Sequence, residues 1–156
     1  MKIKSVALAA AVAAIAISAP AYANETRVEA RGGVVWDGGD SDATAGVAAG
    51  YDWDLGAGAF GGVEVSADKV LTSNTRVSFG TSARVGAKLD GGTKLYAIGG
   101  YQTKPCAGCE DSWTAGAGAE VPFGDKFYGK VEYRHFFVGN GFSDYDGALA
   151  GVGIRF

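Results

Sequence analysis

Eight segments of this chain alternate between apolar and polar side chains, and this alternation limits the possible folds more than any other feature of the sequence. Alternate side chains of a β-strand point to opposite faces of the sheet, so the alternation predicts strands. In the stretch 127–137, Val131 and Tyr133 lie on one face and Lys130 and Arg134 on the other. The segments predicted as strands are 26–36, 43–52, 57–67, 77–88, 93–102, 112–121, 127–137 and 146–156.

Charged residues are confined to one face of these segments. The other face has no Asp, Glu, Lys or Arg, and its strand centres are mostly Ala and Val. A close-packed soluble core favours bulky branched residues, whereas small apolar residues are adequate for contact with lipid. We therefore expect the charged face to line the inside of a membrane barrel. The predicted inward network contains eight basic and five acidic residues: Arg27, Glu29, Arg31, Asp52, Glu64, Arg84, Lys88, Lys94, Glu120, Lys130, Glu132, Arg134 and Arg155.

Aromatic residues on the apolar face lie toward the ends of the segments rather than at their centres. Barrels that cross a bilayer carry aromatic girdles at both membrane interfaces, so this distribution supports a lipid-facing wall. The predicted girdle residues are Trp36, Tyr51, Trp53, Tyr101, Trp113, Phe127 and Phe137.

The connections between the segments alternate in length, as in a meander of hairpins. Short turns on one side and longer polar loops on the other are typical of outer-membrane barrels. The pattern predicts an all-β fold, an eight-stranded antiparallel transmembrane β-barrel with up-and-down topology. The short turns are WDLG, LDGG and PFGDK, and the longer loops are DGGDSD, DKVLTSNTR, TKPCAGCED and VGNGFSD.

Residues 1–23 have the organisation of a cleaved signal peptide. Lys2 and Lys4 precede an apolar run, and the small-x-small motif AYA at 21–23 predicts cleavage before Asn24. The alternative is a retained transmembrane helix, which is disfavoured because a serine and a proline interrupt the run near its end.

Residues 24–156 are predicted to form one outer-membrane β-barrel domain. They contain 12 basic and 17 acidic residues, which gives a net charge of −5. A protein that binds the phosphate backbone of nucleic acid needs a basic excess, so nucleic-acid binding is not expected. No cofactor is expected either, because the sequence has neither a P-loop nor a dinucleotide fingerprint.

Five stretches carry a resemblance to a known family: GYDWDLGAGAFGGVEVSAD, TSARVGAKL, KLYAIGGYQ, AGAGAEVPFGDKFYGKVEYRHF and GVGIRF. Through them the chain resembles the small outer-membrane β-barrel proteins of the OmpA/OmpX and opacity-protein type. The last stretch is similar to the C-terminal signal read by the outer-membrane assembly machinery. That role would fall on Gly151, Ile154 and Phe156, although Leu149 departs from the pattern, in which a polar residue is usual.

The resemblance implies export to the outer membrane of a Gram-negative bacterium. The implied partners are periplasmic chaperones, the assembly machinery, outer-membrane lipid and lipopolysaccharide, with the barrel itself a monomer. The family specifies architecture better than activity, because its members range from anchors to adhesins and narrow pores.

Cys106 and Cys109 form a C-x-x-C motif in the fifth connection. In an exported chain such a pair most simply forms a local disulfide that stiffens a loop. Redox catalysis would need a helix N-terminus to lower the thiol pKa, which a barrel loop does not offer. A zinc site would need two further ligands near the two cysteines, and the one histidine of the chain is His135.

His135 also suggests a second kind of site. With Ser143 and Asp144 nearby in sequence, it could act as the general base of a lipid-modifying enzyme on the outer wall of the barrel. A histidine at headgroup depth explains the same position without catalysis. Asp37, Asp40 and Asp42 could bind a divalent cation, although solvated turn residues are the commoner explanation for such a run.

The sequence favours a structural or surface protein without catalytic activity. The alternative is a narrow pore for small ions, and the predicted inward excess of basic residues would then favour anions. Adhesion and modification of lipid A are further alternatives.

Overall fold

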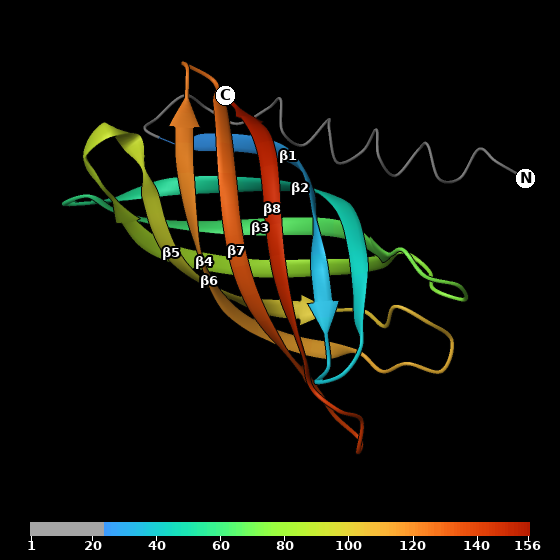
Figure 1. Cartoon of the computed structure of the whole chain (residues 1–156). Helices are drawn as coiled ribbons and strands as arrows, with labels where there is room; N and C mark the ends of the chain where they lie inside the picture. Colours follow the sequence, from blue (N-terminus) through green and yellow to red (C-terminus); the bar gives the residue numbers. More distant parts are fainter. Residues whose placement is uncertain (1–23) are drawn as a thin grey trace, which may run out of the picture.

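The computed structural model describes residues 24–156, and the predicted signal peptide lies outside them. Within these residues, eight β-strands and one short helix follow one another (Figure 1). Within residues 24–156 no helix is long and apolar enough to cross a membrane. The strands are β1 (Glu25–Trp36), β2 (Ser41–Gly56), β3 (Ala59–Val70), β4 (Ser78–Lys88), β5 (Lys94–Gln102), β6 (Ser112–Phe123), β7 (Phe127–Val138) and β8 (Tyr145–Arg155), with the 3-10 helix η1 (Asp90–Gly92) between β4 and β5.

The strands form a closed barrel in the order in which they occur in the sequence. Each pairs antiparallel with its neighbours in the chain, and β8 pairs with β1 to complete the circle. At this junction Arg27 lies opposite Arg155, and the backbones of Thr26 and Phe156 exchange two hydrogen bonds. Closure pairs both edges of each of the eight strands, which confirms the predicted eight-stranded antiparallel meander.

The two ends of the barrel differ. At the end that we call the turn end, short connections join β2 to β3, β4 to β5 and β6 to β7, and the C-terminus lies beside them (Figure 1). The loop end carries the longer connections 37–40, 71–77, 103–111 and 139–144. In a bacterial outer membrane the turn end faces the periplasm and the loop end faces the exterior.

The turn after β2 differs from the prediction. The stretch WDLG is predicted to be the turn, but β2 continues to Gly56, with a bulge between Asp54 and Gly56. The chain reverses at Ala57 and Gly58, whose φ angles are 51° and 79°. The alternation simply continues through this stretch, so the strand is longer than the turn residues suggest.

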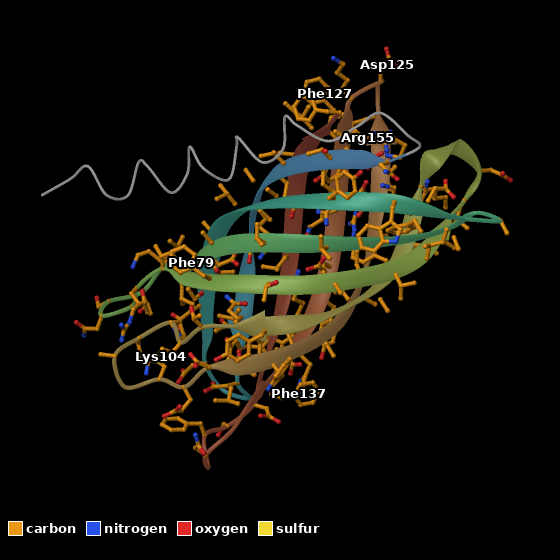
Figure 2. All side chains as sticks on the ribbon, turned by 180° about the vertical axis from the view of Figure 1, so that it is seen from behind. Phe79, Lys104, Asp125, Phe127, Phe137 and Arg155 are labelled. Carbon is orange, nitrogen blue, oxygen red and sulfur yellow. A yellow bond between two sulfur atoms is a disulfide. The ribbon has the colours of Figure 1, made fainter. Side chains whose placement is uncertain are left out.

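The inside and outside of the wall have opposite polarity. Val47, Val131 and Val152 on the outside are 56%, 61% and 60% exposed, whereas Arg27 and Glu120 on the inside are fully buried. Side chains cover the outer wall along its length (Figure 2). A water-soluble protein would place these groups the other way round, so the polarity fits a barrel surrounded by lipid.

Candidate functional site: the filled lumen

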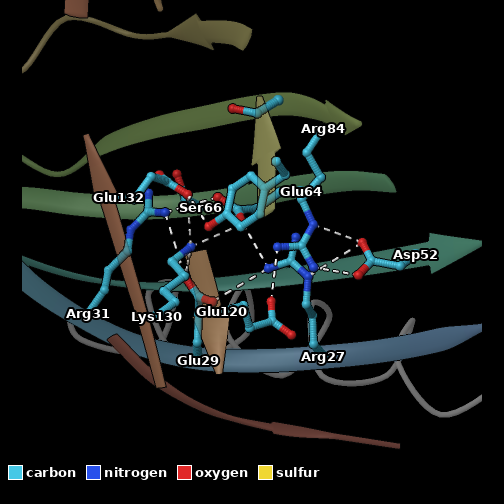
Figure 3. Close-up of polar contacts among 12 residues, drawn as sticks. Arg27, Glu29, Arg31, Asp52, Glu64, Ser66, Arg84, Glu120, Lys130 and Glu132 are labelled. Carbon is cyan, nitrogen blue, oxygen red and sulfur yellow. Dashed lines mark hydrogen bonds and ion pairs between the residues drawn. The ribbon is translucent and has the colours of Figure 1, made fainter. Parts of the chain in front are cut away.

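Glu64 on β3 is the centre of the polar network inside the barrel. Its Oε2 accepts a hydrogen bond from Arg27 Nη1 at 2.8 Å. Its Oε1 accepts hydrogen bonds from Arg31 Nη1 and Arg134 Nη2, each at 2.9 Å. Lys130 Nζ lies 3.5 Å from Oε2. One carboxylate therefore connects β1, β3 and β7 across the lumen (Figure 3).

A second cluster lies nearer the turn end, around Arg84 of β4. Its guanidinium donates Nε and Nη2 to the two carboxylate oxygens of Asp52, with 2.9 Å for the Nε contact, and donates Nη1 to Glu120 at 3.1 Å. Lys94 Nζ donates to Asp52 at 2.8 Å and lies 3.6 Å from Glu120. Arg84 thus ties β4 to β2 on one side and to β6 on the other.

A third cluster lies nearer the loop end. Arg31 binds Asp68 through two parallel hydrogen bonds, Nε to Oδ1 at 2.8 Å and Nη2 to Oδ2 at 2.7 Å. A bidentate pair like that of Arg31 with Asp68 is among the stronger charge-assisted contacts, because both oxygens of the carboxylate are used. Ser66 also donates to Asp68 Oδ2 at 2.9 Å, and Arg134 Nε donates to Glu132 at 2.5 Å.

Two tyrosines fill the space between these clusters. Tyr96 donates its hydroxyl to Glu132, and Tyr128 donates its hydroxyl to Glu29, each at 2.8 Å. The guanidinium of Arg84 lies 4.7 Å from the centre of the Tyr96 ring. The rings occupy volume that water would otherwise take, and their hydroxyls keep the carboxylates partnered.

The lumen is balanced in charge, which corrects the expected basic excess. The side chains of Lys88 and Arg155 lie at the turn-end rim, where they pair with Asp54 and Glu25 and are 31% and 17% exposed. Among residues 24–156, six basic and six acidic residues are buried: Arg27, Arg31, Arg84, Lys94, Lys130 and Arg134, with Glu29, Asp52, Glu64, Asp68, Glu120 and Glu132. A preference for anions therefore has no basis in the charge of the lumen.

Asp68 is the network residue that the sequence prediction missed. The predicted third strand ends at residue 67, but β3 continues to Val70. The signal is present in the alternation itself, since Glu64, Ser66 and Asp68 share the inward face.

A small cavity of about 30 Å³ lies above the network at the loop end. This volume is enough for about two water molecules. Arg31, Asp68 and Arg134 of the network line the cavity together with Ser78 and Gln102, so its polar surface is that of the filled lumen.

The predicted girdle residues form two groups on the outer wall. Trp36, Tyr101, Trp113 and Phe137 lie toward the loop end, and Tyr51, Trp53 and Phe127 toward the turn end. Neighbouring members contact each other, with ring centres 5.4 Å apart for Tyr101 and Trp113 and 6.4 Å apart for Tyr51 and Trp53.

The proposed assembly-signal residues occupy β8 and the end of the chain. Ile154 and Phe156 face outward, 37% and 68% exposed, and Gly151 lies opposite Lys130 of β7. Their recognition by assembly machinery stays a prediction.

Cys106 and Cys109 are joined by a disulfide in the loop 103–111. This loop also contacts the loop before β4, since Thr75 forms a β-bridge with Cys106 and the Arg76 N–H donates to Pro105 O at 2.7 Å. The disulfide thus lies in the loop 103–111, which forms backbone contacts with the loop 71–77.

His135 is held between two carboxylates. Its Nδ1 lies 2.7 Å from Asp146 Oδ1, and its Nε2 lies 3.6 Å from Asp144 Oδ2. Tyr133 donates its hydroxyl to the same Asp146 oxygen at 2.5 Å. In the part of the chain that the structure describes, Asp144 lies near His135 but Ser143 makes no hydrogen bond to it, so the three residues do not form the linked grouping of a catalytic triad.

The acidic run of the first loop does not come together as a ligand cage. Asp37 and Asp40 are linked by a backbone hydrogen bond of 3.4 Å, from Asp37 N to Asp40 O. Across residues 24–156 there is no group of three His, Cys, Asp or Glu residues placed to hold a metal ion.

Comparisons with known proteins agree with this architecture. The barrel is similar to the N-terminal β-barrel domain of Pseudomonas aeruginosa OprF, with a TM-score of 0.59, 17% identity, and coverage of 85% of this chain and 97% of the other. It is similar to Ail, the attachment invasion locus protein of Yersinia pestis, with a TM-score of 0.59, 14% identity, and coverage of 85% and 97%. It also resembles Neisserial surface protein A, with a TM-score of 0.57, 15% identity, and coverage of 88% and 100%.

These likenesses concern the fold alone, because the identities are low. No curated protein matches the sequence. A family model for the outer membrane protein beta-barrel domain, however, matches residues 7–156, almost the whole chain. Together with the closed barrel and its apolar outer wall, this match shows that the chain belongs to the outer membrane β-barrel family of Gram-negative bacteria.

Proposed function

We propose that this protein is a structural component of the outer-membrane surface, without catalytic activity and with a lumen closed to ions. The observation that carries the proposal is the filling of the lumen. Arg84 reaches from β4 to carboxylates on β2 and β6, and Glu64 gathers cations from β1 and β7. Phe60 and Tyr128, both fully buried, occupy more of the same interior.

Passage of an ion would require these groups to separate. Each buried charge has an opposite charge within 4 Å, and an unpaired charge in this enclosed interior would be costly. The equal number of buried acids and bases also provides no excess of one sign to attract a counter-ion. The narrow pore, the runner-up function, therefore has less support than the closed barrel.

Planar-bilayer recording tests the proposal directly. The refolded chain 24–156 is expected to show no discrete conductance. A variant with Phe60→Ala and Tyr96→Ala serves as the positive control, because it removes two rings from the lumen and is expected to admit water and ions. Heat-modifiable migration on a gel verifies that both barrels are folded. Discrete openings by the unaltered barrel would overturn the closed-lumen proposal.

The absence of catalysis has its own test. His135 is the residue on which a lipid-modifying activity would depend, and both of its ring nitrogens face carboxylates rather than a hydroxyl. We expect that cells with the His135→Ala variant have the same lipid A composition as cells with the unaltered protein. A changed composition, measured by mass spectrometry, would contradict the proposal.

The loops at the loop end offer little surface for binding a partner protein. The loops 37–40, 71–77, 103–111 and 139–144 are short, whereas a stable protein interface buries about 800 Å² on each partner. We expect cell binding to be unaffected by shortening the loop 139–144, in a comparison of variant and unaltered cells.

A further inference from the structure

Most cations of this barrel are paired, and the exceptions are concentrated in one place. Among residues 24–156, eight of the 12 basic residues have a carboxylate oxygen within 4 Å. The four described cations without such a pair are Lys69, Arg76, Lys104 and Lys126. Lys126 lies at the turn end, and the other three belong to the loop end.

The three loop-end cations belong to segments that hydrogen bonds join to one another. The Arg76 N–H donates to Pro105 O at 2.7 Å, which places Arg76 beside the residue that follows Lys104. Lys69 Nζ donates to Thr75 O at 2.8 Å and to Thr75 Oγ1 at 3.1 Å. The side chain of Lys69 is thus held against the residue that precedes Arg76.

This cationic cluster, Lys69, Arg76 and Lys104, lies beyond an aromatic part of the outer wall. Lys69 continues the lipid-facing side of β3. Phe79 and Trp113, both exposed, occupy the loop ends of β4 and β6, and Figure 2 shows Lys104 on the loop near the end of the barrel at which Phe79 lies. Exposed aromatic residues mark the level of the lipid headgroups, so the cluster lies at or just above this level.

The carboxylates of the loop end are distributed around the barrel. Those of β1, β8 and their loops are Asp37, Asp40, Asp144 and Asp146. Asp42 lies on β2, the neighbour of β3, and Glu110 lies in the same loop as Lys104, but neither forms an ion pair with a cation among residues 24–156. Asp111 is also in this loop, and its two oxygens accept the Tyr101 hydroxyl at 2.5 Å and the Lys104 backbone N–H at 2.8 Å. These two hydrogen bonds hold the pKa of Asp111 below its usual value, so this carboxylate is ionised and already partnered.

We propose that Lys69, Arg76 and Lys104 form a binding site for the phosphate groups of a glycolipid in the outer leaflet. Arginine and lysine are the side chains that bind phosphate oxygens through charge-assisted hydrogen bonds. The cluster is at headgroup depth, on the lipid side of the wall, and without carboxylate partners among the described residues. The inference rests on the outer-membrane placement in the proposed function, in which the loop end faces the exterior.

The test measures binding of diphosphoryl lipid A to the refolded chain in detergent micelles, by native mass spectrometry. The variant K69Q/R76Q/K104Q removes the cluster, and K126Q removes the unpaired cation at the turn end as a matched control. Each cation near an anionic surface contributes about a fivefold effect on affinity, so the triple variant is expected to raise Kd about 100-fold. K126Q is expected to leave Kd unchanged. Heat-modifiable migration verifies that every variant is folded.

Two further arms identify the ligand chemistry. Lipid A from which both phosphates have been removed is expected to bind no better to the unaltered chain than to the triple variant. Millimolar inorganic phosphate is expected to compete only weakly, because it lacks the acyl chains that contact the wall. Equal Kd values for the triple variant and the unaltered chain, undiminished binding of the dephosphorylated lipid, or full competition by free phosphate would each overturn the proposal.

The outcome is separable from that of the closed-lumen proposal. A conducting barrel that still binds lipid A through the cluster would overturn the closed lumen and support the site. A closed barrel whose lipid A binding does not depend on the cluster would do the reverse.

Discussion

The lumen and the loop end use the same charged residue types in opposite ways. In the lumen, six acidic and six basic residues are buried and each has an opposite charge nearby. At the loop end, Lys69, Arg76 and Lys104 have no ion pair with any residue in the range 24–156. Residues 24–156 carry a net charge of −5, and this charge comes from the two ends of the barrel and not from its interior.

The lumen and the loop end differ in charge balance because only the loop end is in contact with water. Buried charges must be balanced and partnered, because an unpaired charge away from water is costly. At the loop end water can solvate each charge, so balance is not required and the charges remain available for a partner. The interior therefore contributes to stability, and the cations of the loop end are left for the phosphate binding that we propose.

The largest effect is expected from Glu64→Gln in the lumen. The substitution leaves Arg27, Arg31 and Arg134 with one opposing charge fewer. Breaking a buried ion pair costs about 3–5 kcal/mol, and we expect a loss of that size in the free energy of unfolding, measured with urea in lipid vesicles. Glu110→Gln, in a loop, is the control and should cost no more than about 0.5 kcal/mol. Equal losses would remove the distinction between lumen and loop.

A smaller effect is expected from Val131→Arg on the outer wall. Val131 is 61% exposed, a position where a water-soluble protein would accept arginine. In contact with lipid, the same change costs about 2–4 kcal/mol near the middle of the bilayer. Leu71→Arg, at a residue that is 59% exposed in a loop, is the control. If both variants unfold at the same urea concentration as the unaltered barrel, the wall does not face lipid.

Gly118→Ala tests how closely the lumen is packed. A Cβ at Gly118 would lie 2.6 Å from both Cζ and Oη of Tyr96, closer than any ordinary contact. Tyr96 is held by its hydrogen bond to Glu132, so it is not free to move aside. We expect a loss of about 1–3 kcal/mol in the free energy of unfolding. Gly108→Ala, in a loop with open space around it, should leave the barrel unchanged; a similar loss there would argue against packing as the cause.

The smallest effect on the barrel is expected from Cys106→Ser with Cys109→Ser. The disulfide closes a very short segment, so its contribution is limited to about 2 kcal/mol. The loss should appear locally, because the Arg76 N–H depends on Pro105 in the same loop. Hydrogen exchange at Arg76 should accelerate while exchange in β4 stays constant. Acceleration in β4 as well would show that the loop and the lumen are not independent.

The face on which each residue lies can be predicted from sequence, because the period of a strand is two residues. Alternation alone therefore suffices to assign Arg27, Glu64 and Lys130 to the inside of the barrel, where they are buried. Strand ends are harder to predict, since alternation continues past apparent turn residues. The predicted end of the third strand at residue 67, which left out Asp68, and the predicted turn after β2 are wrong for this reason.

The partners of each charge could not be predicted. Alternation states which face a residue occupies, but not its height in the barrel or the strand opposite. The contacts of Glu64 with β1 and β7 depend on the stagger of all the strands around the circle. The position of His135 beside Asp146 depends likewise on the register of β7 with β8.

The seam between β1 and β8 has a consequence for how such a molecule is made. Seven of the eight strand pairings join consecutive strands, but the last joins residues from the two extremes of the domain, down to Thr26 and Phe156. Until the final strand has been delivered, both seam strands expose unsatisfied backbone groups, which hydrocarbon does not tolerate. Closure therefore has to wait until β8 has been made, and a chain cut short within β8 would be unable to seal the barrel.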